Sequence, residues 1–489
     1  MLIRHARAWP ASAHPAGQQR GDAADLDALP RTDVRLAGGL ITECGTGLRP
    51  VPGETEIDAA GGLLLPGLHD HHVHLRALAA AAASVAAGPP DTPSAAALAA
   101  RLRAADARLP PGAWLRAVGY HESVAGPLDR AALDRLLPDR PVRVQHRTGA
   151  LWVVNSLGAA RLGLDRCELS GVERDRDGRP TGRLWRMDRW LAERLPAGAA
   201  TLGAVGSAAA ALGVTGFTEA TPGATADDLA ALAAEPVSQR LHCMAPPGIS
   251  PPRRLSPRIY RDTGDGTGGS VVTVGPEKII LDDTALPPLP EIADRIARAH
   301  AAGRPVAVHC VTRVQLVLTL AALDLAGRRP GDRIEHGAVI GPDSVADLNG
   351  LTVVTQPHFV VERGEQYAAD VPPADLPDLW RLRSLIDAGV SVAAGSDAPY
   401  GAADPWHAMR AAVRRPKEFR AAQEALSPVA ALALFLGQPE APGTPRLIAP
   451  GQPADLTLLR AGPREALDSL ASDLVAATLV GGELIYTRD

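Results

Sequence analysis

The chain has 489 residues, which is too long for one compact core of ordinary size and predicts two or three structural units. Apolar residues make up 46% and charged residues 21%, which is typical of globular proteins and excludes a largely disordered chain. The formal net charge is −5, and no basic segment stands without acidic neighbours. We therefore expect neither nucleic acid nor an anionic membrane surface as a partner.

The first residues carry positive charge without an apolar segment behind it, so we expect no secretory signal. No stretch approaches the roughly twenty apolar residues of a membrane helix. The cysteines are scattered, without a CxxC pair, which favours a reducing compartment. They are Cys44, Cys167, Cys243 and Cys310. We expect a cytoplasmic protein.

The two ends of the chain have the same character. Residues 1–64 and 446–489 both consist of short β-like segments interrupted by Gly and Pro. Neither end is long enough to form a good sandwich alone. We predict that they combine into one small composite β-sandwich domain.

Residues 65–445 alternate strand-like apolar segments with Ala/Leu-rich helical segments, the pattern of βα units. Lys278 and His309 are 31 positions apart and His309 and His336 are 27 apart, close to a βαβ repeat of about thirty residues. The pattern predicts an α/β fold, a (β/α)8 TIM-type barrel. Its eight expected strands lie at 67–75, 213–220, 240–245, 278–283, 305–310, 333–337, 351–357 and 390–397.

Residues 90–200 do not follow this repeat. They contain the strand-like segments "AWLRAVGY" and "PVRVQHR" and a turn-rich stretch, so we interpret them as an insertion after the first barrel strand. An insertion at that end of a barrel is a candidate lid. The glycine-rich run at 262–270 is expected to be a loop without a phosphate-binding pattern.

The first expected strand carries a histidine pair. His72 and His74 are two positions apart in "HDHHVHL", so they project from the same side of a strand, with Asp70 in the same phase. His69 and His71 are expected to point the other way. Two such imidazoles can bind one metal ion.

Other candidate ligands end other strands. His309, His336 and Asp397 each close an expected strand, where catalytic groups of a barrel gather. Singly, each histidine could be a hydrogen-bonded, half-buried residue, and Asp397 a cap or turn former. Together with the histidine pair they favour a metal site.

Lys278 is one of two lysines, with Lys417, among 50 basic residues. Nearby cations and burial both favour the neutral amine over the ammonium. A neutral amine can react with CO₂ to give a carbamate whose two oxygens can bridge two metals, whereas arginine stays protonated. The alternative is a lysine at a strand edge paired with Glu277.

This ordered set, His72-Val73-His74, Lys278, His309, His336 and Asp397, resembles the ligand set of the amidohydrolase superfamily. The stretches "GAWLRAVGYHES", "RTGALWVVNSLGAARLGL", "DGRPTGRL" and "AAGSDAPYGAADPWHAM" resemble the branch that includes N-substituted formamide deformylase-like enzymes. The resemblance covers nearly the whole chain. It implies a metal-dependent hydrolase that cleaves a C–N amide-type bond of a small molecule, either an N-acyl, N-formyl or cyclic amide.

The resemblance also implies roles for the ligands. His72, His74 and Asp397 would hold one divalent ion, His309 and His336 a second, and carbamylated Lys278 would bridge them together with a hydroxide. Asp397 would carry the proton from the nucleophile to the leaving nitrogen. Imidazole and carboxylate ligands suit Zn²⁺ best, with Mn²⁺ or Fe²⁺ as alternatives.

The substrate side is less determined by the sequence. Tyr120, His121, Trp152 and His358 are expected to line the pocket, or else to serve ordinary packing. A mononuclear deaminase, a hydrolase of esters or lactones, and a non-catalytic scaffold are the alternatives. The only partner we expect is the small-molecule substrate, and a homodimer is left open.

Overall fold

The computed structural model describes residues 1–10, 28–195, 201–250 and 272–488, so the predicted loop at 262–270 lies outside the described residues. The chain divides into two compact units. One combines Met1–Leu75 with Leu202–Asp489, and the other is Arg76–Thr201. The second unit spans the residues of the predicted insertion and begins earlier, at Arg76.

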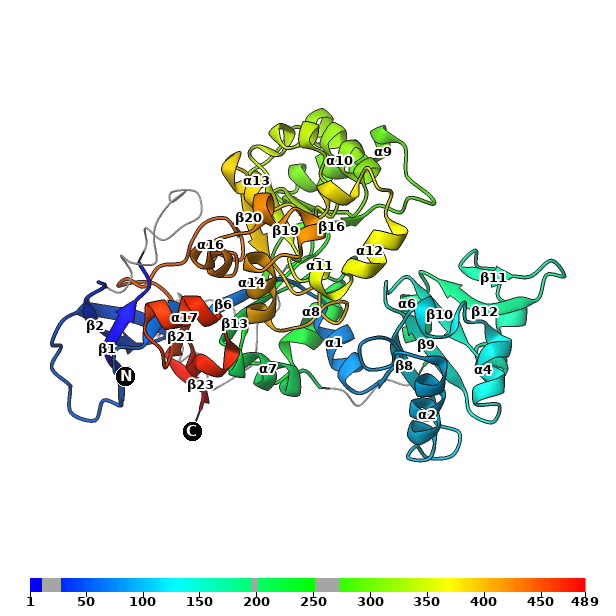
Figure 1. Ribbon diagram of the computed structural model, residues 1–489, viewed down its shortest axis with the longest axis horizontal. Coiled ribbons are helices and arrows are strands. Elements are labelled where there is room, and N and C mark those ends of the chain that lie inside the picture. The colour runs from blue at the N-terminus through cyan, green and yellow to red at the C-terminus, as the bar shows by residue number, and fades with distance from the viewer. Residues whose placement is uncertain (11–27, 196–200, 251–271, 489) are drawn as a thin grey trace. The chain divides into compact units, whose positions relative to one another are not determined.

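The two ends of the chain pair in one sheet, in which the blue and red strands of Figure 1 lie together. The order is β23-β22-β21-β5-β1-β2-β3, with β4 beside β1, and β5 joins the two ends by pairing antiparallel with β21. Buried Ile3, Val34, Leu64 and Leu458 belong to its core. The strands are β1 Leu2–Ala8, β2 Arg31–Ala37, β3 Leu40–Gly45, β4 Glu56–Asp58, β5 Leu63–Pro66, β21 Leu456–Leu459, β22 Val475–Val480 and β23 Glu483–Thr487.

Nine parallel strands of the same unit form two further sheets, in the orders β15-β14-β13-β6 and β16-β17-β18-β19-β20. Each of the eight predicted strand segments overlaps one of them, and β15 is additional. Their residues are almost all buried, which explains the near-continuous apolar runs. The strands are β6 Leu68–Val73, β13 Val214–Glu219, β14 Arg240–Cys243, β15 Val272–Val274, β16 Glu277–Ile280, β17 Val306–Cys310, β18 Arg333–His336, β19 Thr352–Thr355 and β20 Ser391–Ala394.

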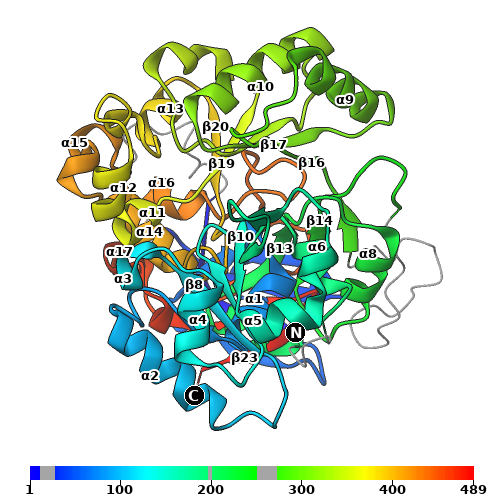
Figure 2. The same ribbon diagram turned by 90° about the vertical axis from the view of Figure 1, so that its right-hand side faces the viewer.

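Helices cover these parallel sheets, and α9, α10 and α13 form a layer over the β16–β20 sheet in Figure 2. Helix α9 buries Ile292, Ile296 and Ala299, which are spaced to lie on one helix face. No helix among the described residues is long and apolar enough to cross a membrane. The helices of this unit are α7 Leu202–Ala211, α8 Ala226–Ala233, α9 Leu289–Ala301, α10 Arg313–Ala326, α11 Phe359–Glu362, α12 Gly364–Asp370, α13 Arg383–Asp387, α14 Pro405–Val413, α15 Ala421–Glu424, α16 Pro428–Ala433 and α17 Pro463–Ser469. Helix α1 spans Leu75–Ala82, across the boundary between the units.

The Arg76–Thr201 unit has its own six-stranded sheet, in the order β11-β12-β10-β9-β8-β7. Strands β7, β8 and β9 are parallel, and the remaining pairs are antiparallel. Leu98 and Leu102 of α2 belong to a core with Leu115 and Val142 of the sheet. The elements are β7 Val85–Ala86, β8 Leu115–Tyr120, β9 Val142–His146, β10 Leu151–Val154, β11 Val172–Arg174, β12 Pro180–Trp185, α2 Ala95–Asp106, α3 Glu122–Ala125, α4 Arg130–Leu136, α5 Ser156–Leu162 and α6 Asp188–Ala192.

Candidate metal centre

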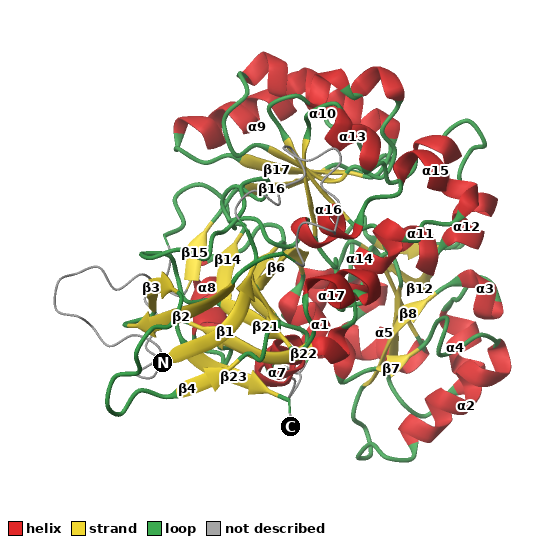
Figure 3. Ribbon diagram, turned by 60° about the vertical axis from the view of Figure 1, so that its left-hand side comes forward, coloured by secondary structure: helices red, strands yellow, loops and turns green. Residues whose placement is uncertain are grey.

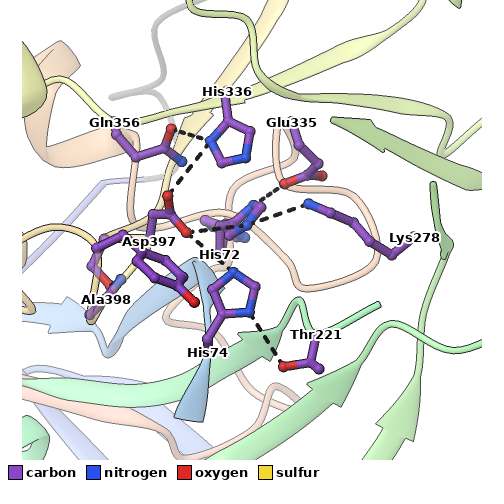
Figure 4. Close-up of polar contacts among 12 residues, drawn as sticks. His72, His74, Thr221, Lys278, Glu335, His336, Gln356, Asp397 and Ala398 are labelled. Atoms are coloured by element: carbon purple, nitrogen blue, oxygen red, sulfur yellow. Dashed lines mark hydrogen bonds and ion pairs between the residues drawn. The ribbon is translucent and has the colours of Figure 1, made fainter. Parts of the chain in front are cut away.

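The six predicted ligands all belong to the unit that contains the parallel sheets. They are in or just beyond β6, β16, β17, β18 and β20. Figure 4 shows His72, His74, Lys278, His336 and Asp397 turned toward one another. His309 belongs to the same cluster, because its ring centroid lies 4.5 Å from that of His336.

Three of these side chains converge closely enough for one ion. Asp397 Oδ1 lies 3.7 Å from His72 Nε2 and 3.3 Å from His74 Nε2. One ligand atom of each residue lies within 4.8 Å of the other two. Two imidazole nitrogens and a carboxylate oxygen in this arrangement are a suitable donor set for a divalent transition metal.

Hydrogen-bond acceptors behind two histidines fix which ring nitrogen faces the cluster. The Glu335 carboxylate accepts from His72 Nδ1, and Gln356 Oε1 accepts from His336 Nδ1 at 2.8 Å. A neutral imidazole that donates through Nδ1 keeps an unprotonated Nε2. Both rings therefore present a lone pair, as metal-binding histidines do.

His74 is held in the same way. Its Nδ1 lies 3.3 Å from Thr221 Oγ1, and the Thr221 hydroxyl donates to Glu219. Because the hydroxyl hydrogen is engaged by the carboxylate, its oxygen is left to accept from His74 Nδ1. The His74 Nε2 lone pair then faces Asp397.

Burial sets the charge of the cluster. It acts together with the nearby Lys278 to lower the pKa of His72 to about 3. It also lowers the pKa of His309 and His336, so these rings are neutral near neutral pH. Although burial opposes ionisation, the His74 hydrogen bond and nearby histidines hold the pKa of Asp397 below its usual range. Neutral imidazoles beside one ionised carboxylate favour a cation.

Lys278 is 3% exposed, and its Nζ lies 3.4 Å from His72 Nε2. Burial lowers the pKa of this amine to about 8, although Glu335 and Asp397 act in the opposite direction. Glu277, which the sequence offered as an alternative partner, accepts from Arg295 Nε at 2.7 Å. The lysine therefore faces the candidate ligands from a buried position.

Strands β6 and β20 come into close contact at the cluster. The Asp397 N–H donates to His72 O at 2.7 Å, and the His74 N–H donates to Ala398 O at 2.9 Å. A Cβ added at Gly395 would lie 2.4 Å from the His72 nitrogen, so this approach requires glycine. This contact brings together candidate ligands from β6 and β20, the first and the last of these parallel strands along the chain.

Two ligand residues have strained backbones. His336 has φ of 70° and Asp397 φ of 52°, in the left-handed region that non-glycine residues avoid. Such strain persists where the surrounding structure holds it, and it gathers at functional sites. The left-handed backbone sets the direction of two side chains, that of His336 at the end of β18 and that of Asp397 just beyond β20.

Asp70 does not join the ligands despite its phase in the sequence. It accepts from the Ser396 hydroxyl at 2.5 Å and from the backbone N–H groups of Ser396 and His72 at 2.9 and 3.1 Å. Burial raises the pKa of this carboxyl group to about 6. Its role here is to tie β6 to the segment that follows β20.

The side chains predicted to contact substrate have varied surroundings. Tyr120 and Trp152 are buried in the Arg76–Thr201 unit, where Tyr120 donates to Gly126 O at 2.5 Å and Trp152 donates to Asp188 at 2.8 Å. His121 is the N-cap residue of α3 in the same unit, and its ring accepts from the Ser123 N–H at 3.2 Å. His358 is fully buried and donates from Nε2 to Ser396 O at 3.1 Å, which places it one residue from Asp397.

Sequence reasoning missed the acceptors Glu335, Gln356 and Thr221. Glu335 had a signal, because a carboxylate inside the buried strand "RIEH" requires a partner. It has two, since Arg333 Nε and His72 Nδ1 both donate to it. Gln356 and Thr221 follow strands and carry no comparable signal.

Comparison with solved structures supports the α/β fold. An uncharacterized metal-dependent hydrolase from Pyrococcus horikoshii OT3 superposes with a TM-score of 0.68, covering 94% of this chain and 97% of the other at 16% identity. The model of the Amidohydrolase family matches residues 55–486. The chain therefore belongs to the Amidohydrolase family and is a hydrolase that acts on carbon–nitrogen bonds.

Two relatives are similar over most of their length. The putative amidohydrolase YtcJ of Bacillus subtilis (strain 168) is 24% identical, with 89% of this chain and 91% of the relative covered. The N-substituted formamide deformylase of Arthrobacter pascens is 26% identical, with 78% and 80% covered. The donor set described above fits the divalent metal use that the family implies.

Proposed function

We propose that this protein hydrolyses an N-acyl, N-formyl or cyclic amide of a small molecule at a metal centre. The observation that carries the proposal is the convergence of His72 Nε2, His74 Nε2 and Asp397 Oδ1 beside a buried lysine. The similarity to a formamide deformylase supports an acyl or formyl group on nitrogen. The neighbouring His358, buried behind Ser396, is a positioning residue in this proposal.

The proposal includes two divalent ions, and zinc is the preferred metal. His72, His74 and Asp397 would hold one, and His309 and His336 the other. A bound divalent ion supplies a water of lowered pKa and polarises a carbonyl group. The packing of His309 against His336 supports the second position.

Lys278 would bridge the two positions as a carbamate. Its neutral amine adds to dissolved CO₂, forming the N–C bond and releasing one proton to solvent. The lowered pKa of the amine supports this step, because the neutral form is the one that reacts. Arginine cannot react in this way.

Asp397 would move the proton. Its carboxylate is ionised because its pKa is lowered, so it can accept a proton from the attacking water. It then returns that proton to the leaving nitrogen, which departs as an amine. The left-handed backbone at Asp397 keeps the carboxylate aimed at His72 and His74.

The two parallel sheets are, in this proposal, the halves of one closed (β/α)8 barrel. The hydrogen bonds between the segments after β6 and β20 support closure on one side. On the other, Ala245 after β14 donates to Pro276 O beside β16. Strands β15 and β16 would then be one barrel strand interrupted at Gly275–Pro276.

A single-metal centre is the second candidate. Among the described residues of this cluster, only His72, His74 and Asp397 have ligand atoms that all lie within 4.8 Å of one another. This arrangement favours one ion. Such a centre would suit a deaminase-type hydrolysis. Counting metal equivalents per chain distinguishes the two candidates.

The lysine provides the decisive experiment. We expect Lys278→Arg to lose one metal equivalent and at least about a hundred-fold in turnover, since the loss of a bridging ligand disrupts the centre. The control is Lys417→Arg, which changes the only other lysine. Metal content and hydrolysis of an N-acyl, N-formyl and cyclic amide panel are measured for both. Full metal content and turnover in Lys278→Arg would refute the carbamate.

A further inference from the structure

Helix α10 has an apolar side that faces away from the sheet it covers. Its other side packs inward, where Leu316 and Leu320 are buried. On the outer side Val314 is 58% exposed, Val317 is 53% exposed and Leu325 is 65% exposed. Single exposed apolar side chains are ordinary, but a row of them along one helix marks an interaction surface.

The exposed residues belong to a continuous row, which we name the α10 stripe. Because an α-helix turns by about 100° per residue, its members lie within an arc of about 100°. No charged residue occurs from 314 to 323. The neighbouring helix α9 differs, since its exposed residues include Glu291 and Asp294. The members of the stripe are Val314, Val317, Leu318, Ala321 and Leu325.

The two ends of the stripe have different shapes. A groove of about 500 Å³ lies along its amino-terminal half and is lined by stripe residues and by Leu286, with Arg313 also in its wall. At the carboxyl-terminal end Leu325 projects into solvent. The surface therefore offers an apolar groove at one end and a projecting apolar side chain at the other.

These two features are spaced to fit a second copy of the same surface. Val314 in the groove and Leu325 are eleven positions apart. Eleven residues correspond to about 16.5 Å along a helix and to three turns plus about 20°, so both side chains lie on one line. A twofold axis at the middle of α10 would place each Leu325 opposite Val314 of the partner subunit. A twofold interface requires this kind of self-complementary patch.

Charges at the edge of the stripe favour the same antiparallel arrangement. Arg313 and Asp324 are also eleven positions apart, and their side chains are 38% and 62% exposed. They form ion pairs within the chain, Arg313 with Asp375 and Asp324 with Arg328. The twofold axis would bring each Arg313 level with Asp324 of the partner subunit. A parallel arrangement would instead place like charges level with one another.

We propose that the α10 stripe is the contact surface of a homodimer, in which α10 of one chain packs antiparallel against α10 of a second copy. The proposal does not rest on the proposed function, because it uses no residue of the candidate metal centre. One pair of helices gives an interface below about 1,200 Å². The dimer should therefore be weak and depend on protein concentration.

The test is sedimentation of the full-length protein from about 1 to 100 μM, where wild type should pass from monomer to dimer. Val317→Glu and Leu325→Glu should each raise the dissociation constant at least about thirty-fold, because a charge would be buried in an apolar contact. The matched control is Leu169→Glu, since Leu169 is a 50% exposed leucine of the other unit. This control should dimerise as wild type does. A monomeric wild type, or one dissociation constant for all four proteins, would overturn the proposal.

A pair of cysteines tests the antiparallel register. Val314→Cys and Leu325→Cys combined in one chain should give a disulfide-linked dimer on mild oxidation, because the two positions face each other across the axis. Each substitution alone should leave monomers on a non-reducing gel, since like positions would be about 16 Å apart. Circular dichroism verifies that every variant is folded. Equal crosslinking by the single and combined variants would overturn the antiparallel contact.

Discussion

Each histidine of the candidate metal centre has two different ring nitrogens, and the residues behind it decide which one is available. The Glu335 carboxylate does this for His72, and Arg333 Nε in turn donates to Glu335. Arg333 also donates to His71 O at 2.8 Å, so the carboxylate is fixed by a buried cation that is itself anchored to β6. Glu335 therefore positions the His72 ring.

Changing Glu335 to Gln should weaken metal binding about 10–100-fold, because partners of ligand histidines set ring orientation and basicity. The amide keeps the size of the side chain but removes the charge that holds the His72 Nδ1 hydrogen. Metal affinity is measured by competition with a chelator. Glu424→Gln is the control, since Glu424 is also buried and paired with an arginine, Arg381. An unchanged affinity in Glu335→Gln would exclude this role.

Among the elements, β14 carries a buried histidine that lies outside the ligand set. His242 Nδ1 lies 2.8 Å from Thr273 Oγ1 of β15, while its buried Nε2 has no hydrogen-bond partner among the described residues. Burial, together with the positive charges of Arg333 and Arg304, lowers the pKa of this ring to about 3. Glu440, at 3.9 Å from Nδ1, is the nearby acidic group.

This histidine predicts a pH dependence of stability. The pKa of His242 is about 3 in the folded state. On unfolding the ring becomes exposed to water and its pKa returns to 6.5, so below pH 6.5 the unfolded chain binds one more proton than the folded chain. Stability must therefore fall as the pH falls from 6.5 toward 3. From about pH 7.5 to about pH 5.5, His242 should contribute a loss of about 1.4 kcal/mol.

The comparison is between wild type and His242→Asn in urea unfolding at the two pH values. The variant should lose about 1.4 kcal/mol less than wild type over this interval. Its own stability at the higher pH serves as the reference, so the cost of the substitution itself cancels. An identical pH dependence in both proteins would contradict the assigned protonation state.

For the larger unit as a whole, buried hydroxyls link the terminal sheet to the parallel strands. Thr457 of β21 donates to Gly213 O just before β13, and Thr478 of β22 donates to Ala210 O of α7, both at 2.7 Å. Figure 3 shows strands from both ends of the chain beside α7. The terminal sheet is therefore joined to the part that carries the candidate metal centre.

Replacing Thr457 or Thr478 by Val should lower the free energy of unfolding by about 0.5–1.5 kcal/mol for each site, since each change removes one buried hydrogen bond. The carbonyl oxygens of Gly213 and Ala210 each keep a backbone N–H donor, from Leu68 and Gly213. Valine has nearly the same shape, so packing is preserved. Thr42→Val is the control, because Thr42 makes an exposed bond to Arg35 O. Urea unfolding measures all three variants, and a loss no larger than that of Thr42→Val would contradict the proposed link.

Local pattern was sufficient for much of the fold. Each predicted segment from 67–75 to 390–397 overlaps a parallel strand, because burial on both faces forces continuous apolar runs and helices separate them at regular spacing. It was insufficient within β6. The register between β6 and β13 shifts twice, so strict alternation fails there, and His69 and His71 are buried like His72.

The sequence by itself determined which residue types stand at or near the ends of the strands, and hence the candidate ligand set and the family resemblance. Only the tertiary structure decided how they are oriented: His72 and Glu335 are 263 positions apart, and Asp70 is 326 positions from Ser396. The physical reason is that periodicity reports local burial, whereas a hydrogen-bond partner is chosen by strand order and register.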